Sequence, residues 1–160
     1  MTPLWLRFAA AVALLLALAT VRASNAADPI RIGYLGPLTG IFAQAGKDML
    51  DGLKLSLEQV NHEVAGRKIE LVIEDSQGKP DIGLTKARKL VESDRVHLLL
   101  AELVSVVGNA MAPYVNAERI PWVNTVALAA LTRSQRSPYI FRFVPSSYQF
   151  GLTGDRKSVV

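Results

Sequence analysis

The residues of this chain that could do chemistry include glycines, a serine, two histidines and one pair of acids. Gly40 and Gly46-Lys47 follow a short apolar segment, as the glycines of a phosphate-binding loop would. Such a loop needs four residues between its first glycine and the Gly-Lys pair. Five lie here, and Asp48 stands where a magnesium-holding Ser or Thr belongs. The apolar segment also lacks the Gly-x-Gly-x-x-Gly spacing of dinucleotide sites. We interpret these glycines as turn residues.

Catalytic and metal-binding patterns are also incomplete. Ser105 lies between an apolar segment and an expected helix, but its neighbours Leu103 and Val107 are not the glycines of a nucleophile elbow. His62 and His97 are single histidines with no partner four residues away, so zinc binding has little support. We therefore expect no enzyme activity and no cofactor.

Two polar features point to ligand binding. A serine at a helix start offers its hydroxyl, free backbone N–H groups and the positive end of the helix dipole, which together suit a carboxylate. Ser105 is such a serine, although plain helix capping is the alternative. The acidic pair Glu74-Asp75 follows an apolar segment and could bind an ammonium group or act as an acid. We favour the simpler interpretation, in which the pair caps and solvates the next loop.

Strands and helices alternate along the chain. Apolar runs predict strands, and three- and four-residue apolar spacing predicts helices, one of them beginning at a capping Ser146. Repeated strand–helix units predict an α/β fold, an open parallel sheet with flanking helices. Such sheets bind ligands beyond the carboxyl ends of their strands. The expected strands are 30–35, 68–74, 96–101, 120–124 and 139–143, and the expected helices are 47–62, 80–93, 104–117 and one from 146.

The first 26 residues have the layout of a secretory signal. Arg7 precedes an unbroken apolar run, Phe8–Leu18, and Ser24-Asn25-Ala26 offers the small residues that a signal peptidase reads. The run is too short to span a bilayer. The chain has no cysteine, hence no site for a lipid anchor. We therefore expect residues 1–26 to be a cleaved signal peptide and the remainder to be a free periplasmic protein.

Charge gives little support to nucleic-acid binding. The net charge is +4, and 50% of residues are hydrophobic and 20% charged, as in globular proteins. Removing residues 1–26 takes away Arg7 and Arg22 but no acid, which leaves 16 basic against 14 acidic residues. These charges are mixed along the chain and do not form a basic stripe. We expect no nucleic-acid partner.

Ordered sequence pieces between Ile30 and Gln149 resemble a known family. Their order and spacing are similar to those of substrate-binding proteins of ABC importers, of the branched-chain amino acid (Leu/Ile/Val-binding) type. The resemblance implies a type I periplasmic binding protein fold with two α/β lobes, which trap a small solute and deliver it to an ABC permease in the inner membrane. The matching pieces are 32–40, 43–48, 51–52, 61, 66–71, 74–75, 79–80, 89–92, 120–121, 131–132 and 137–142.

The resemblance also implies a site for an amino acid or a similar small carboxylate or amide. In this family the first lobe grips the ligand through the helix-start serine and the loop after the fourth strand. We add Phe42, in the loop after the first strand. The expected ligand-binding residues are Ser105, Thr125, Val126, Ala127, Leu128 and Phe42.

Two segments depart from the family's pattern. Val126-Ala127-Leu128 replaces the common Ala-Ala-Ser/Thr, so a hydroxyl is lost and backbone groups are expected to serve instead. Ala101-Glu102 replaces the usual Gly-Pro and is expected to place a negative charge near the mouth of the cleft. Neither departure identifies the ligand.

The expected organisation is a signal peptide (1–26), an incomplete N-terminal lobe (27–154) and a non-native tail (155–160). The tail, DRKSVV, can be read from a common sequencing adapter. Family members are much longer, so we expect truncation within the first lobe, exposed apolar surface and weak solute binding by the chain alone. A ligand-sensing receptor of the same fold is the alternative function, although a signal peptide argues against a cytoplasmic sensor.

Overall fold

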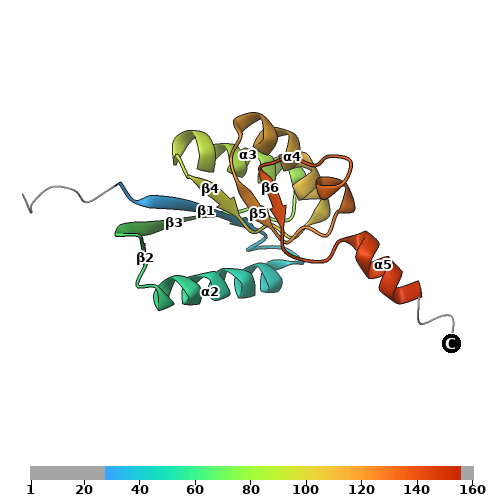
Figure 1. Ribbon diagram of the computed structural model, residues 1–160, viewed down its shortest axis with the longest axis horizontal. Helices are drawn as coiled ribbons and strands as arrows, with labels where there is room; N and C mark the ends of the chain where they lie inside the picture. Colours follow the sequence, from blue (N-terminus) through green and yellow to red (C-terminus); the bar gives the residue numbers. More distant parts are fainter. Residues whose placement is uncertain (1–27, 156–160) are drawn as a thin grey trace, which may run out of the picture.

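A six-stranded sheet forms the centre of the computed structural model, which describes residues 28–155 (Figure 1). The order of the strands is β2-β3-β1-β4-β5-β6. All neighbours are parallel except β2, which forms an antiparallel pair with β3. The expected parallel α/β sheet is therefore confirmed. The strands are β1 (Ile30–Gly36), β2 (Glu63–Val64), β3 (Arg67–Asp75), β4 (Leu98–Leu100), β5 (Trp122–Asn124) and β6 (Ile140–Arg142).

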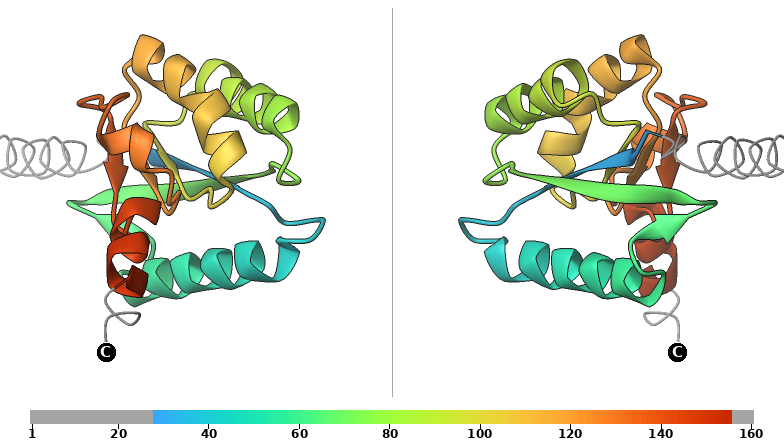
Figure 2. Two further views of the ribbon diagram at one scale, coloured as in Figure 1. Left: turned by 90° about the vertical axis from the view of Figure 1, so that its right-hand side faces the viewer. Right: turned by 90° about the vertical axis from the view of Figure 1, so that its left-hand side faces the viewer.

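Helices cover the two faces of the sheet unequally. Figure 2 shows α2 alone on one face and α3 and α4 on the other, while α5 leads away from the sheet (Figure 1). Within residues 28–155, none of the helices has the length and apolar character needed to cross a membrane. The helices are α2 (Ala43–Gln59), α3 (Pro80–Arg88) with the π-helical turn η2 (Lys89–Ser93), α4 (Ser105–Glu118), the 3-10 turn η3 (Ala129–Thr132) and α5 (Ser147–Asp155).

The ends of two helices test the sequence predictions. The serine cap of α5 is confirmed, because Ser146 Oγ accepts the Gln149 N–H and Gln149 Oε1 accepts the Ser146 N–H, a reciprocal capping box. The predicted range 47–62 was wrong for α2, which begins at Ala43 and ends at Gln59. Asn61 and His62 both have a φ of 51°, and this left-handed backbone cannot continue a helix.

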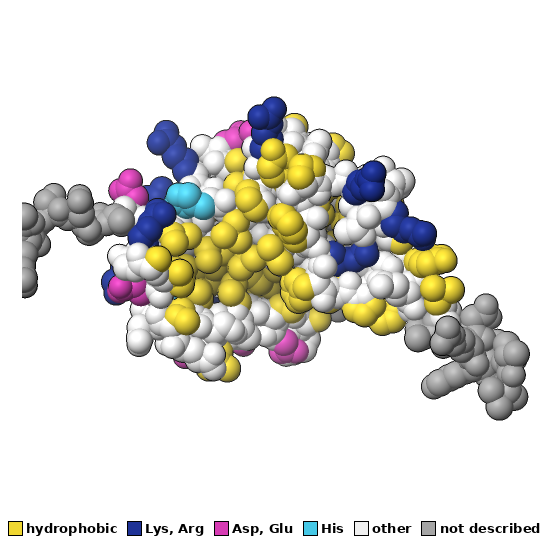
Figure 3. Space-filling view, in the orientation of Figure 1, with side chains coloured by type: hydrophobic (Ala, Val, Ile, Leu, Met, Phe, Trp, Pro, Cys, Tyr) yellow, Lys and Arg dark blue, Asp and Glu magenta, His cyan; other side chains and the backbone are white. Residues whose placement is uncertain are grey.

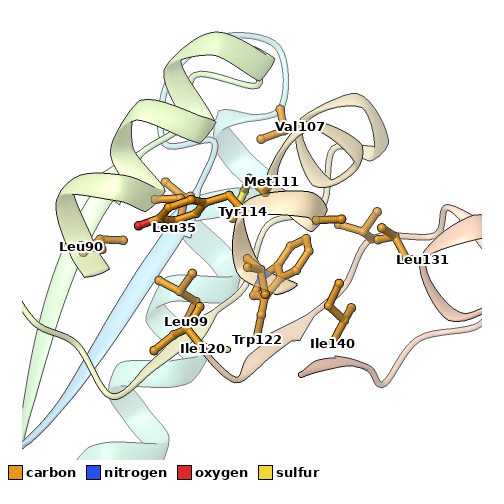
Figure 4. Packing of buried hydrophobic residues seen from close by; sticks show 14 of the residues in the cluster. Leu35, Leu90, Leu99, Val107, Met111, Tyr114, Ile120, Trp122, Leu131 and Ile140 are labelled. Atoms are coloured by element: carbon orange, nitrogen blue, oxygen red, sulfur yellow. The ribbon is translucent and has the colours of Figure 1, made fainter. Parts of the chain in front are cut away.

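The main hydrophobic core lies between the sheet and helices α3 and α4 (Figure 4). Leu35, Leu99 and Trp122 point from three adjacent strands toward Met111 of α4, and all four are fully buried. The Trp122 indole N–H also donates a hydrogen bond to the Ala101 carbonyl oxygen over 3.1 Å. The core therefore holds both α4 and the end of the segment that leads into it.

A smaller cluster lies under α2. Tyr34, Leu50 and Ala101 are buried there. The Tyr34 hydroxyl donates to the Gly46 carbonyl oxygen over 2.6 Å, and burial raises the pKa of Tyr34 to about 12. This buried bond fixes the first turn of α2 to β1.

The remaining strands on the α2 face are uncovered. Figure 3 shows hydrophobic side chains gathered beside α2, over the strands. Phe141 of β6 is 52% exposed and Phe143, just beyond it, is 68% exposed. Phe143 lines a hollow of about 390 Å³ together with Leu100 and Val123. Apolar surface is thus exposed, as we expected from the sequence, and surfaces of this kind favour association.

We expect the double variant Phe141→Thr/Phe143→Thr to reduce self-association of the chain. Threonine suits an extended backbone but removes the exposed aromatic rings. Sedimentation velocity over a concentration series measures the effect. Ile41→Ser is the matched control, because Ile41 is 93% exposed but is absent from the lining of the hollow. Equal loss of association in both variants would contradict a role for this face.

Candidate functional site

The first turn of α4 lies beyond the carboxyl end of β4, where we expected the ligand to bind. Ser105 is the first residue of the helix, and the capping position belongs to Val104, which makes no side-chain capping bond. The Gly108 N–H donates to the Val104 carbonyl oxygen over 3.0 Å. The amides of residues 105–107 come before this bond and have no acceptor within the helix. Among the described residues, the Ser105 hydroxyl has no recorded hydrogen-bond partner, so plain capping does not explain it.

A pocket of about 310 Å³ opens at this helix start. The structure brings together two of the predicted residues there, Ser105 and Leu128, and adds Val106, Asn109 and Ala130. Asn109 was missed by the sequence prediction. Its position four residues after Ser105 places it on the same helix face, and this spacing was the available signal.

Thr125 holds the site together and does not line this pocket. Its backbone N–H and its hydroxyl both donate to the Glu102 carbonyl oxygen, over 3.1 and 2.8 Å. Its side chain faces the hollow under α2. Thr125 therefore ties the loop after β5 to the loop after β4.

Val126 and Ala127 are also engaged by the fold. Val126 is fully buried, and an added Cβ on Gly108 of α4 would lie only 2.8 Å from its side chain. The Val126 N–H donates to the Asn124 side chain over 3.0 Å. The Ala127 carbonyl oxygen accepts the Ser147 N–H over 2.7 Å. These contacts set the position of Leu128 at the pocket.

Phe42 lies apart from the Ser105 pocket. It is 40% exposed and lies beside Gly78, whose added Cβ would be 3.5 Å from the Phe42 ring and 3.7 Å from the Val104 side chain. Phe42 is therefore near the start of α4 without being among the residues that line the pocket.

The acidic pair Glu74-Asp75, at the end of β3, makes structural contacts. Glu74 accepts from Lys86 and Lys89, with N–O distances of 2.7 and 2.8 Å. The Asp75 carboxylate accepts the Leu38 and Gln77 amides, both over 2.8 Å, and the Thr39 hydroxyl over 2.6 Å. Partial burial raises the pKa of Asp75, but these hydrogen bonds outweigh it and hold the pKa below its ordinary value. Asp75 therefore caps the loops, as interpreted, whereas Glu74 forms ion pairs with α3 and η2 and does not cap a loop.

Among the residues discussed from the sequence, Glu102 lies farthest from the environment that we expected for it. The sequence placed its charge near the mouth of the cleft, whereas its side chain is fully buried behind the start of α4. Oε1 accepts the Leu103 and Val104 amides over 3.0 and 2.8 Å. Ala101 and Glu102 have φ values of 76° and 66°, and this left-handed backbone turns the carboxylate inward.

Known proteins share the fold described above. A family model described as "Periplasmic binding protein" matches residues 29–154. The Leu/Ile/Val-binding protein homolog 6 of Brucella abortus (strain 2308) is 28% identical over 138 residues, which are 84% of this chain and 35% of the relative. A Pseudomonas aeruginosa protein that binds leucine, isoleucine, valine, threonine and alanine is 30% identical over 123 residues, 76% of this chain and 33% of the relative. The chain thus spans about a third of the length of these relatives.

Solved structures match the same region. An ABC transporter substrate-binding protein from Sphaerobacter thermophilus is 43% identical with a TM-score of 0.69, and the match covers 71% of this chain and 32% of that one. A solute-binding protein of an ABC transporter from R. palustris, in complex with benzoate, is 27% identical with a TM-score of 0.76. That match covers 80% of this chain and 36% of the other.

Proposed function

Since the chain belongs to the periplasmic binding protein family, we propose that it captures an amino acid or a similar small carboxylate or amide in the periplasm for an ABC importer. Proteins of this family bind solutes and are not enzymes. The proposed location rests on the signal-like residues 1–26, which lie outside the described residues. The proposed partner is an ABC permease in the inner membrane.

The observation that carries this proposal is the unoccupied hydrogen-bonding capacity at the start of α4. Ser105 lines the pocket, and the free first-turn amides lie at the same end of α4, the positive end of the helix dipole. This combination stabilises a carboxylate, because several N–H and O–H donors are held in place before the ligand arrives.

The walls of the pocket indicate what the carboxylate is attached to. Val106, Leu128 and Ala130 are apolar, and Asn109 is the polar member besides Ser105. A small acid with an apolar body fits this lining. The Pseudomonas aeruginosa relative is named for binding leucine, isoleucine, valine, threonine and alanine, and one similar structure is in complex with benzoate, so both have small acids as ligands.

We expect benzoate and leucine to bind the chain weakly, with dissociation constants in the millimolar range, which correspond to a binding free energy of about −4 kcal/mol. The pocket offers one wall, whereas tight sites enclose most of the ligand surface. Titration followed by amide NMR shifts measures such affinities, and the largest shifts should fall on Ser105, Val106 and Val107. Ser105→Ala should weaken benzoate binding about ten-fold, because a hydrogen bond to a charged group contributes about 1.5 kcal/mol or more.

Ser147→Ala is the matched control for this titration. Ser147 is the first residue of α5, as Ser105 is of α4, but it does not line the pocket. Shifts centred on the hollow under α2, or equal affinities in both serine variants, would refute the α4 site. Submicromolar binding would instead contradict the expectation that this chain holds only part of a cleft.

A further inference from the structure

Among residues 28–155, Glu102 is the one buried acid, and it lies directly behind the proposed site. Its side chain has no solvent exposure, and Oε1 accepts two backbone amides at the entry to α4. Within the described residues, the second oxygen, Oε2, is buried without a hydrogen-bond partner. No ion pair of Glu102 is recorded for residues 28–155. The solute-binding role described above does not require such a group.

The surroundings favour the neutral acid. A buried carboxylate with one unpaired oxygen is far more costly than a buried carboxylic acid with one unpaired hydroxyl. Burial raises the pKa of Glu102, and the nearby Asp75 carboxylate raises it further. The Val104 and Leu103 amides lower it, as does the Ser76 hydroxyl, which lies close without a hydrogen bond to Oε2, but they do not reverse the shift. The titratable groups that face Glu102 within the described residues are Asp75, at the end of β3, and Tyr34, on β1.

The position of Glu102 couples its charge to the first turn of α4. Its carboxyl group is bonded to the amide of Val104, and the first free amide of the helix belongs to the next residue, Ser105. A negative charge on Glu102 repels an anionic ligand that is hydrogen-bonded to those amides. The repulsion is poorly screened because Glu102 is buried. A neutral side chain keeps the same two hydrogen bonds without the repulsion.

We propose that Glu102 sets the charge selectivity of the α4 site. With Glu102 neutral, the first turn of α4 accepts an anionic ligand, and with Glu102 ionised it disfavours anions relative to neutral amides. This inference rests on the proposed function, because it assumes that ligands contact residues 105–107. The coupling is reciprocal, so that a bound anion also favours proton uptake by Glu102.

A pair of ligands of the same shape tests the inference. Benzoate is anionic above about pH 5 and benzamide is neutral, so amide NMR titrations of the chain at pH 5 and pH 8 separate charge from shape. We expect benzoate binding to weaken about ten-fold once Glu102 is ionised at the higher pH, while benzamide binding stays constant. Glu102→Gln should abolish this pH dependence, because glutamine keeps the accepting oxygen but cannot ionise. A benzoate profile that stays equally steep in Glu102→Gln overturns the proposal.

Glu118→Gln is the matched control, because it removes one negative charge from the last residue of the same helix, at an exposed position. It should retain the pH dependence of the wild-type chain.

A direct measurement needs neither ligand nor variant: the side-chain carboxyl ¹³C shift of Glu102 is followed against pH. If the Glu102 carboxyl titrates at or below the ordinary glutamate pKa, the proposed charge selectivity is refuted even if benzoate binds at Ser105. Absence of binding by either ligand, together with a raised Glu102 pKa, would instead refute the proposed function.

Discussion

Replacement of Trp122 by alanine is expected to lower the free energy of unfolding by about 3–5 kcal/mol. The side chain projects from β5 and is fully buried in the main core, toward Met111 of α4 (Figure 4). Alanine leaves a large cavity and also removes the hydrogen bond to the Ala101 carbonyl oxygen. Since single domains are stable by about 5–15 kcal/mol, this loss is a large fraction of the total. Urea unfolding followed by circular dichroism measures it.

Trp122→Phe separates packing from hydrogen bonding at the same position. Phenylalanine fills most of the space but cannot donate to Ala101, so we expect a loss of about 1–3 kcal/mol. The Ala101 carbonyl precedes Glu102 and α4, so both variants should also shift the amide signals of Leu103 and Val104. If Trp122→Ala lowers the free energy of unfolding no more than Trp122→Phe, the cavity is not the main cause of the destabilisation.

The strand next to Trp122 shows what local sequence patterns can and cannot predict. The apolar run 96–101 correctly predicted a buried parallel strand, because a strand covered on both faces needs no polar alternation. Only Leu98–Leu100 pair in the ladder, however. Arg95 and Ala101 have φ values of 53° and 76°, and this left-handed backbone ends the extended segment on both sides. Residue types do not reveal such conformations when no glycine is present.

Part of the site was predictable because it is local. A serine between a buried strand and an apolar helix predicts the start of that helix, and Ser105 is the first residue of α4. The burial of Glu102 was not predictable, because charged residues are normally exposed and nothing adjacent in sequence shields this one. Its shielding comes from segments distant in sequence, since Ser76 lies close to its carboxyl group and Thr125 bonds to its carbonyl oxygen.

The early start of α2 also has a non-local cause. Apolar periodicity begins near Met49 and therefore does not predict a helix start at Ala43. The Gly46 N–H donates to the Phe42 carbonyl oxygen, and the Gly46 carbonyl oxygen accepts the Tyr34 hydroxyl. This first turn is therefore held by β1 and by the close approach of the loop after it.

Gly46→Ala is expected to destabilise the chain by about 3 kcal/mol or more. An added Cβ would lie 2.0 Å from the Pro37 carbonyl oxygen and 2.8 Å from its carbon, and both are backbone atoms that cannot move without displacing the loop after β1. The higher helix propensity of alanine recovers only about 1 kcal/mol. Thermal and urea unfolding measure the loss. Because Phe42 lies on this loop, its ring resonances should also shift.

The same substitution at Gly52 should have the opposite effect. Gly52 lies in the middle of α2, and apart from its chain neighbours and the backbone of its own helix no described atom is within 4 Å of the position of its added Cβ. Gly52→Ala should therefore stabilise the chain by about 1 kcal/mol through helix propensity alone. The two variants make an identical chemical change in one helix, so a difference of about 4 kcal/mol between them isolates the contact with Pro37. If both variants stabilise the chain, the close approach of α2 to the loop after β1 is not what fixes the start of the helix.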